Sequence, residues 1–330
     1  PLRLGSPHDG EKDRQHRRRS QGRPGDVVAL QEVESERALS ALIRRLRQFG
    51  LDYPHLHIGS RRGSTVHCAL ISRYPITDRK ELRVPLPGAR NVLKASLRIE
   101  GAPLTVSVNH WHAKTHPEST RIKAARVLRA SIERLPKGTD YILIGDFNSN
   151  YNEAETFRDN HQLNNTNGKT GINHVLGTWE GDEPVTERQL RANARGSRHY
   201  NTWLELKPEE RWSRRLSDRK DSLDHMLLPA ALYDGRGISY VEDSFGRYAP
   251  DYLIRDKRVY RWQRARGGRG KHLGKGYSDH LPIYALFSTE PFQTANATIE
   301  HPPREADQTP KVTVGTLYRL EPGPVNASLE

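Results

Sequence analysis

Short apolar runs alternate with amphipathic stretches through most of the chain. Residues 27–30 (VVAL) and 141–144 (YILI) are continuous apolar runs, and each predicts a buried strand. In residues 35–49 apolar side chains recur three or four positions apart, which predicts a helix. A second helix is predicted over residues 117–135, where Pro136 ends the pattern. This alternation of strands and helices predicts a layered α/β fold.

Several predicted strands are followed directly by polar residues, which places a candidate site at strand ends. Further strands are predicted at residues 67–71, 92–99, 104–108, 222–228 and 281–287. Between Phe157 and Asp221 the sequence is polar, contains scattered tryptophans and has weak periodicity, so we expect long loops around the site. Cys68 lies within a predicted strand and is expected to be a small core residue.

The two ends of the chain differ in composition from its body. Residues 1–25 are charged and irregular, so they are predicted to form a basic leader or a degenerate first strand. Residues 26–289 carry the strand and helix pattern and form the predicted domain. Residues 290–330 are expected to hold a Pro-rich linker and the truncated start of a C-terminal segment, with one strand-like run in KVTVGTLYRL.

Composition and charge narrow the class of protein. The 330 residues include 53 Lys+Arg against 40 Asp+Glu, a formal net charge of +13, and the mean hydropathy is −0.82. No apolar run is long enough to span a membrane, and a single cysteine excludes a disulfide framework or a cysteine-based zinc site. The positive charge favours an anionic partner. Charge alone makes nucleic acid a candidate for that partner but does not identify it.

Five short polar signatures stand at the ends of predicted strands. They are Gln31-Glu32, Asn109-His110, Asp146-Phe147-Asn148, Asp224-His225 and Ser278-Asp279-His280. Each has an ordinary structural explanation, such as a helix-terminal charge, a turn or a cap. Together they are poorly explained in that way, because acids and histidines recur at five strand ends.

The set has the groups that metal-assisted phosphodiester cleavage requires. Glu32 and Asp279 could supply the carboxylate oxygens that a hard divalent ion prefers. Asp146 is a candidate for activating water, and Asn148 could donate a hydrogen bond to the phosphate.

Two histidines complete this constellation. His110 and a protonated His280 could stabilise the negative charge that develops around phosphorus. Asp224 would hold the His280 ring and raise its basicity. Whether Asp146 or His280 activates the water stays open at this point.

The signatures resemble those of a known family. LQEVE, VNHWHAK, ILIGDFN, SLDHMLL and YSDHLPI, in this order, are similar to the metal-dependent endonuclease/exonuclease/phosphatase superfamily that shares its fold with DNase I, and to its bacterial nuclease-type members in particular. The resemblance spans about residues 26–289. It implies a four-layer α/β sandwich, with two central mixed or antiparallel sheets flanked by helices, and phosphodiester hydrolysis dependent on Mg²⁺ or Mn²⁺.

The resemblance also assigns roles to residues of this sequence. It implies that Glu32 is a metal ligand and that Asp279 is the acidic residue beside the metal. His110 would contact the phosphate. Asp146 and Asn148 would form the catalytic pair of the GDFN loop, with Asp224 supporting His280.

One departure concerns the first strand of the family, which normally carries a metal-binding Asn. Residues 2–9 (LRLGSPHD) echo the start of that pattern but place Pro7 and His8 where an aromatic residue and the Asn would fall. Either His8 replaces the Asn, or the true strand lies upstream, or residues 1–25 are a non-native leader. Imidazole is a softer ligand than a hard-cation site prefers, so a replaced Asn would weaken the metal site.

Two basic segments lie near the signatures and predict contacts to nucleic acid. Residues 255–275 hold nine Arg or Lys against one Asp, with Tyr260 and Trp262 between them. Arg261, Arg264 and Lys275 are the predicted substrate-binding residues of this segment. Residues 211–220 (RWSRRLSDRK) add a second basic patch. Backbone contacts of this kind predict low sequence specificity.

The leading hypothesis is a nuclease that cuts DNA, with RNA as a further substrate. One alternative is a phosphatase or a sphingomyelinase-like phosphodiesterase, which would use an apolar aromatic hairpin that the sequence does not display. Another is a nucleic-acid-binding pseudoenzyme that lacks the first-strand Asn. The sequence predicts neither membrane insertion nor a protein partner. A secreted or periplasmic location is one expectation, since similar proteins are often exported.

Overall fold

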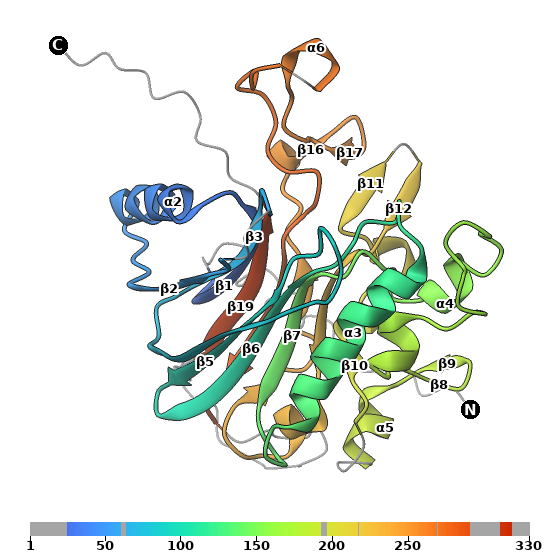
Figure 1. Cartoon of the computed structure of the whole chain (residues 1–330). Coiled ribbons are helices and arrows are strands. Elements are labelled where there is room, and N and C mark those ends of the chain that lie inside the picture. Colours follow the sequence, from blue (N-terminus) through green and yellow to red (C-terminus); the bar gives the residue numbers. More distant parts are fainter. Residues whose placement is uncertain are drawn as a thin grey trace, which may run out of the picture.

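Two β-sheets packed face to face form the centre of the molecule, with one long helix against the outer face of each (Figure 1). The computed structural model describes residues 25–60, 64–192, 197–216, 218–268, 270–290 and 311–318. The order of layers is therefore α2, first sheet, second sheet, α3, where α2 is Glu36–Gln48 and α3 is Glu118–Glu133. This confirms the predicted four-layer α/β sandwich.

The strands of both sheets are mostly antiparallel, with one parallel pair in each. The first sheet has the order β14 (Ser239–Tyr240), β18 (Ile283–Ser288), β19 (Lys311–Tyr318), β1 (Val27–Val33), β3 (His67–Ser72) and β2 (His55–Ile58), with β15 (Gly246–Arg247) also paired to β18. The second has the order β10 (Tyr200–Asn201), β13 (Asp224–Leu228), β7 (Tyr141–Asp146), β6 (Ala102–His110), β5 (Val92–Ile99) and β4 (Ile76–Leu82). The parallel pairs are β1 with β19 and β6 with β7.

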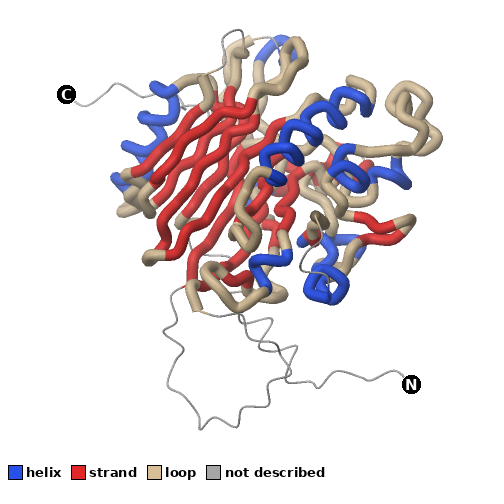
Figure 2. The backbone as a smooth tube through the Cα atoms, turned by 60° about the horizontal axis from the view of Figure 1, so that its bottom comes forward, coloured by secondary structure: helices blue, strands red, loops and turns tan. Residues whose placement is uncertain are grey.

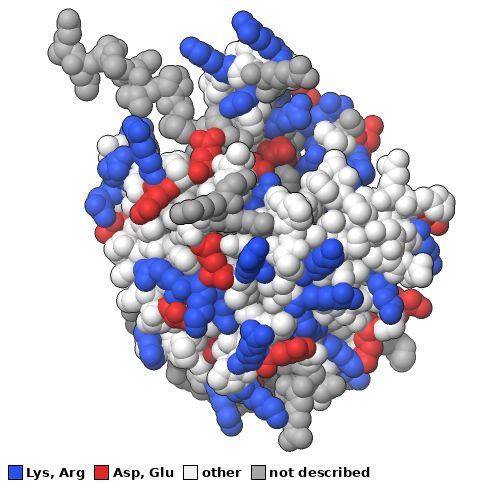
Figure 3. Space-filling view, in the orientation of Figure 1, with Lys and Arg blue, Asp and Glu red and all other residues white. Residues whose placement is uncertain are grey.

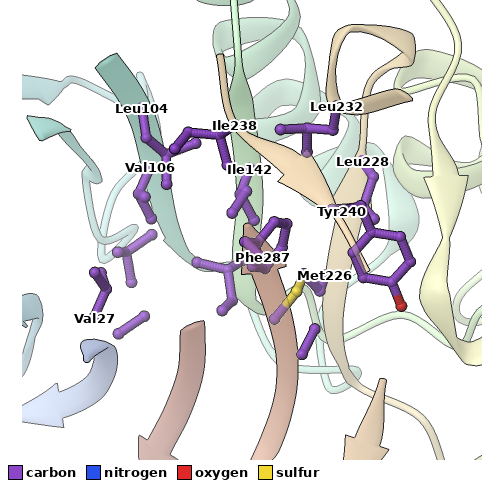
Figure 4. Close-up of a cluster of buried hydrophobic side chains, with 14 of the residues drawn as sticks. Val27, Leu104, Val106, Ile142, Met226, Leu228, Leu232, Ile238, Tyr240 and Phe287 are labelled. Carbon is purple, nitrogen blue, oxygen red and sulfur yellow. The ribbon is translucent and has the colours of Figure 1, made fainter. Parts of the chain in front are cut away.

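The continuous apolar strands pack against a neighbouring layer on each of their two faces. In β7, Ile142 and Ile144 face the core between the sheets, while Tyr141 and Leu143 pack toward α3. Successive strand residues point to opposite faces, so a strand buried on both faces must be apolar throughout. Figure 4 shows the inter-sheet core, where Ile142 lies near Phe287 of the other sheet.

The outer helices bury amphipathic faces. Leu39 and Ile43 of α2 pack on the first sheet, and Ser35 caps the helix by accepting a hydrogen bond from the Ala38 N–H at 3.2 Å. Ala125 and Leu128 of α3 pack on the second sheet. Figure 2 shows the strands running between these flanking helices. Cys68 is a buried core residue of β3, as predicted.

The strand-like run near the C-terminus belongs to the first sheet. β19 lies between β18 and β1, and Val314 is paired with Ala285 on one side and Val27 on the other. The expectation that residues 290–330 hold only a linker and the start of another segment is therefore wrong for residues 311–318. The sequence shows that a strand forms there but not its partners, because strand pairing is non-local. Residues 1–24, with the predicted leader or degenerate first strand and His8, lie outside the described residues.

The stretch between Phe157 and Asp221 is more ordered than the expected long loops. It buries Trp203 completely and contains short elements. The remaining short elements of the described residues are the helices α4 (Glu153–Thr156), α5 (Glu187–Ala192) and α6 (Ala265–Gly268), single helical turns at Gly171–Val175, Thr202–Glu205, Pro208–Glu210, Ala230–Tyr233 and Asp251–Leu253, and the hairpins β8–β9 (Trp179–Glu180, Glu183–Pro184), β11–β12 (Arg214–Leu216, Arg219–Asp221) and β16–β17 (Ile254–Arg255, Arg258–Val259).

Helices of the described residues are too short or too polar to cross a bilayer.

Candidate active site

Three neighbouring strands of the second sheet bring His110, Asp146 and Asp224 into one row. β6 and β7 run parallel, and His110 is in register with Asp146. β13 runs antiparallel to β7, and Asp224 is in register with Asp146 from the other side. Side chains in register point to the same face of a sheet, so three of the five polar signatures converge through strand pairing alone.

Gly145 makes the close approach of β6 and β7 possible. Its φ is 126°, and a Cβ at this position would lie only 2.2 Å from the carbonyl oxygen of Asn109. Any larger residue would push the strands apart, and the side chain of the next residue, Asp146, would move away from His110. The glycine of the GDFN signature is therefore needed for the geometry of the row.

Asp146 is held from two sides. The backbone N–H of Asn148 donates to Asp146 Oδ1 at 2.7 Å, and Asn148 Nδ2 donates to Asp146 Oδ2 at 3.0 Å. His110 Nε2 lies 3.5 Å from Asp146 Oδ2. Asn148 Nδ2 also donates to the Trp111 carbonyl at 3.1 Å. Both amide N–H groups of Asn148 are thus engaged within the protein, and this residue orients Asp146.

Asp224 and His280 form a buried pair that joins the two sheets. His280 Nδ1 lies 2.9 Å from Asp224 Oδ2, and both side chains are almost inaccessible to solvent. The indole N–H of Trp203 donates to the Asp224 carbonyl at 2.6 Å and fixes the strand that carries the acid. The predicted support of His280 by Asp224 is present in the structure.

The environment shifts the pKa values of these groups in different directions. Burial raises the pKa of Asp146 to about 7, with the charge of Asp224 acting in the same direction. Burial lowers the pKa of His280, but the charge and hydrogen bond of Asp224 outweigh it, and the net pKa is raised to about 9. Burial and the charge of Arg90 lower the pKa of His110 well below its usual value. At neutral pH His280 is therefore charged and His110 is neutral.

Glu32 and Asp279, the predicted metal ligands, border this group. The charge of Glu32 acts on Asp146, and that of Asp279 acts on Asp224 and His280. Glu32 has a φ of 59° at a bulge in β1, where the pairing with β3 shifts register. This backbone conformation is strained for a residue with a side chain and is typical of functional positions.

The donor set fits a hard divalent cation. Ligand atoms of Asp146, Asp224 and His280 lie within 4.8 Å of one another, but His280 is bonded to Asp224 and charged, so the carboxylates are the better ligands. Among the described residues, Asp224 Oδ1 and both polar atoms of the Gln31 amide are buried without a hydrogen-bond partner. Buried polar atoms are normally satisfied, so these fit a site that holds a cation, phosphate or water. Of the predicted ligands, Glu32, whose charge acts on Asp146, would be the principal one, with Asp146 beside the ion.

The sequence pattern of the "Endonuclease/Exonuclease/phosphatase family" matches residues 14–280. The chain belongs to this family. Members of the Endonuclease/Exonuclease/phosphatase family are hydrolases that act on phosphoester bonds, and they generally depend on divalent metal ions. No curated protein sequence gave a match.

Solved structures of similar fold have low sequence identity to this family member. One is D. rerio TDP2 complexed with a single-strand DNA product (17% identity, TM-score 0.49, 80% of this chain and 86% of that chain). Another is humanized D. rerio TDP2 with 14 mutations (18%, 0.48, 80% and 86%). A third is an endonuclease/exonuclease/phosphatase family protein from Leptotrichia buccalis (16%, 0.47, 86% and 94%).

The loop after β7 is tied to two other signature segments of this family member. Lys114 Nζ lies 2.7 Å from Glu153 Oε2, which also accepts from the Asn150 N–H at 2.6 Å. His225 Nε2 lies 2.8 Å from the Ser149 carbonyl, and burial lowers the His225 pKa to about 3. Sequence reasoning did not find these positioning contacts. Their only signal was the charged Lys114 in the HWHAK signature.

Arg90 is a further residue near the site that sequence reasoning missed. Its charge acts on both His110 and Cys68, so the guanidinium lies close to the end of the row. No predicted strand end marks it, because it stands in the loop that precedes β5. A partly buried arginine beside a phosphate-cleaving site suits anion binding.

The basic segment before Ser278 forms a projecting arm, which we define as residues 248–277 (Figure 1). Figure 3 shows Lys and Arg side chains at its tip, at the top of that view. Arg261, Arg264 and Asp279 line one groove of about 1120 Å³, so two of the predicted substrate residues lie beside the signature. The Lys275 carbonyl accepts from the Gln263 N–H on the returning strand of the arm, and Lys275 is not among the residues lining the groove.

The second basic patch, residues 211–220, makes many of its contacts within the protein. Arg211 donates to the carbonyls of Leu206 and Leu204, and Arg214 and Arg219 both pair with the buried Asp221. β11 still lies beside the site, because Arg214 forms a backbone bridge with His280. This patch is therefore partly structural.

Proposed function

We propose that this protein hydrolyses phosphodiester bonds of nucleic acid, in DNA and also in RNA, with low sequence specificity and with Mg²⁺ or Mn²⁺ as cofactor. The observation that carries the proposal is the convergence of His110, Asp146 and Asp224 in one row, with His280 bonded to Asp224. Asp146 supplies a proton acceptor, His110 a neutral hydrogen-bond donor, and His280 a positive charge held in place by Asp224.

The pKa values favour Asp146 as the group that accepts a proton from the attacking water. His280 has a pKa of about 9 and is already protonated at neutral pH, so it cannot act as the base there. Asp146 has a pKa of about 7 in the metal-free protein and is oriented by Asn148. We therefore assign the role of base to Asp146 in this proposal.

The two histidines have separate roles in this proposal. The His280 imidazolium stabilises the negative charge that develops on the phosphate oxygens, and Asp224 keeps the ring charged and oriented. His110 is neutral and donates a hydrogen bond to the phosphate. A divalent ion held by Glu32, with Asp146 beside it, would polarise a phosphate oxygen and offset its charge.

A substrate panel tests the proposal. Supercoiled plasmid, single-stranded DNA, RNA, sphingomyelin and a phosphomonoester would be incubated with the protein in Mg²⁺ and in EDTA. We expect cleavage of nucleic acid only, in Mg²⁺ only, with a loss of about 100-fold or more in Asp146→Ala and His280→Ala. The exposed residues Asp52 and His161 provide the matched controls Asp52→Ala and His161→Ala.

The other outcomes of the panel identify the alternative functions. Hydrolysis of sphingomyelin or of the monoester in place of nucleic acid would favour the lipid or phosphatase alternative. The structure does display a projecting aromatic arm, which the sequence alone did not reveal, so sphingomyelin belongs in the panel. Binding of nucleic acid without any cleavage would favour the pseudoenzyme.

A further inference from the structure

Four tyrosines form a continuous row along the arm. The ring centroids of Tyr248 and Tyr252 are 6.5 Å apart, those of Tyr252 and Tyr277 are 5.6 Å apart, and those of Tyr277 and Tyr260 are 6.3 Å apart. Tyr252 and Tyr277 are 53% and 47% exposed. Large aromatic side chains so exposed at the middle of a row are unusual, and they leave ring surface available to a ligand.

The row lies next to the active site and next to unpaired positive charge. Tyr277 directly precedes the Ser278-Asp279-His280 signature, so its Cα is at most ~10 Å from that of His280. The groove of about 1120 Å³ on the arm is lined by Arg255, Arg258, Arg261 and Arg264 together with Asp279. Within the described residues, the exposed Arg258 and Arg261 pair with no carboxylate.

We propose that the arm binds an unpaired stretch of nucleic acid, with Tyr252 and Tyr277 stacking on its bases and the groove arginines contacting its phosphates. This inference rests on the proposed function, because it takes nucleic acid as the substrate. It goes further by making the enzyme select single strands. The bases of a duplex are stacked on each other and offer no free face, whereas an unpaired base can stack on a tyrosine ring regardless of its identity.

The chemistry of the arm favours nucleic acid over a lipid surface. The hydroxyls of Tyr248 and Tyr252 lie 3.0 Å apart and make one side of the row polar. On the described part of the arm, Leu273 is the only strongly exposed large aliphatic side chain. Rings interleaved with arginines match alternating bases and phosphates better than they match a hydrocarbon interior.

The test is fluorescence anisotropy of labelled nucleic acid in EDTA, so that no cleavage occurs. The probes are a single strand of ~16 nucleotides, its duplex, and the same backbone with abasic positions. The proteins are the parent, Tyr252→Ala/Tyr277→Ala, and Tyr252→Phe/Tyr277→Phe, which keeps the rings. Phe49→Ala, which removes the ring of a 66% exposed residue at the C-terminal cap of α2, is the control.

We expect the parent to bind the single strand at least about tenfold more tightly than the duplex. The double Ala variant should lose that preference, whereas the double Phe variant and Phe49→Ala should keep it. The abasic strand should bind the parent as weakly as the intact strand binds the double Ala variant. Equal affinity of the parent for strand and duplex would overturn the inference. So would an unchanged double Ala variant, or Tyr-dependent binding to sphingomyelin vesicles that exceeds binding to the strand.

Cleavage assays distinguish this inference from the proposed function. If the parent and the double Ala variant cleave duplex and single strand equally well in Mg²⁺, the proposed function stands and the inference fails. If the parent binds the single strand through the two tyrosines but cleaves no nucleic acid, the inference stands and the proposed function fails.

Discussion

At the scale of single residues, burial affects Asp146 and His280 in opposite ways. It raises the pKa of the acid to about 7, and it lowers that of the imidazole until Asp224 more than compensates and brings it to about 9. The carboxylate at Asp224 therefore decides whether His280 carries a charge at neutral pH. A change at Asp224 should act on catalysis through His280.

We predict that Asp224→Asn lowers the pKa of His280 from about 9, because burial remains while the largest compensating charge is lost and only the weaker effects of Asp146 and Asp279 still raise it. The measurement is an NMR titration of the His280 ring in the metal-free protein. Phosphodiester cleavage at neutral pH should fall by roughly 100-fold or more, since Asp224 no longer keeps His280 protonated and opposite the phosphate. A His280 pKa that stays near 9 in the variant would contradict this account.

Asp140 provides a prediction about stability away from the site. Burial raises its pKa from 3.8 to about 7, although its carboxylate accepts the Ile238 N–H at 2.7 Å. Between these two pH values the folded protein keeps a proton that the unfolded chain has lost. Unfolding then releases a proton, so this residue makes stability fall as pH rises from about 3.8 to about 7.

We expect Asp140→Asn to be more stable than the parent above pH 7 and to lose this advantage below pH 3.8, because an amide oxygen can still accept the Ile238 N–H. Chemical denaturation across this pH range measures the difference. Asp159→Asn, at an exposed position, is the control and should leave the slope unchanged. Parallel pH profiles for Asp140→Asn and the parent would be inconsistent with a raised pKa.

At the scale of elements, β19 is the strand that joins the two halves of the first sheet. It separates β18 from β1, and Val314 is paired on both sides. Val314→Pro removes a backbone donor from the ladder and leaves an acceptor unsatisfied, at a cost of roughly 1–3 kcal/mol. We predict a thermal midpoint lower by several degrees than in Val314→Ala, which keeps the N–H. Equal midpoints for the two variants would contradict the placement of β19.

Elements with a local signal were predicted well from the sequence. Residues 92–99 form β5 within the predicted bounds, and α3 begins and ends within two residues of the predicted helix. The pairing of β19 was not predictable, because its partners lie far away in the sequence. β4 was missed because its residues alternate weakly and are mostly exposed.

The candidate site divides in the same way. Glu32, His110 and Asp146 were found because each ends or follows an apolar run, and Asp224 and His280 because each stands just before one. Arg90 and the tyrosine row were missed, since their relation to the site arises only when separate loops fold against it. The engagement of Asn148 with Asp146 and Trp111 was likewise not visible in the GDFN signature.

At the scale of the whole molecule, the net charge of +13 includes the arginines that line the groove of the arm, and these should make nucleic-acid binding depend on salt. Each phosphate neutralised on a single strand contributes about 0.7 to the slope of log affinity against log salt. We predict that Arg258→Ala/Arg261→Ala reduces this slope by ~1.4. Arg37→Ala/Arg44→Ala on the exposed side of α2 is the matched control and should leave the slope as in the parent. An unchanged slope in the arm variant would exclude these arginines from phosphate contact.

The central claim is that His110, Asp146, Asp224 and His280 form one metal-assisted site for phosphodiester hydrolysis. Hydrolysis of bis(p-nitrophenyl) phosphate tests it most directly, because this small diester contains no nucleobase and does not need to bind the arm. The account predicts hydrolysis by the parent and by His161→Ala in Mg²⁺ or Mn²⁺, none in EDTA, and a loss of about 100-fold or more in Asp146→Ala. Hydrolysis that persists in EDTA or survives Asp146→Ala would contradict it.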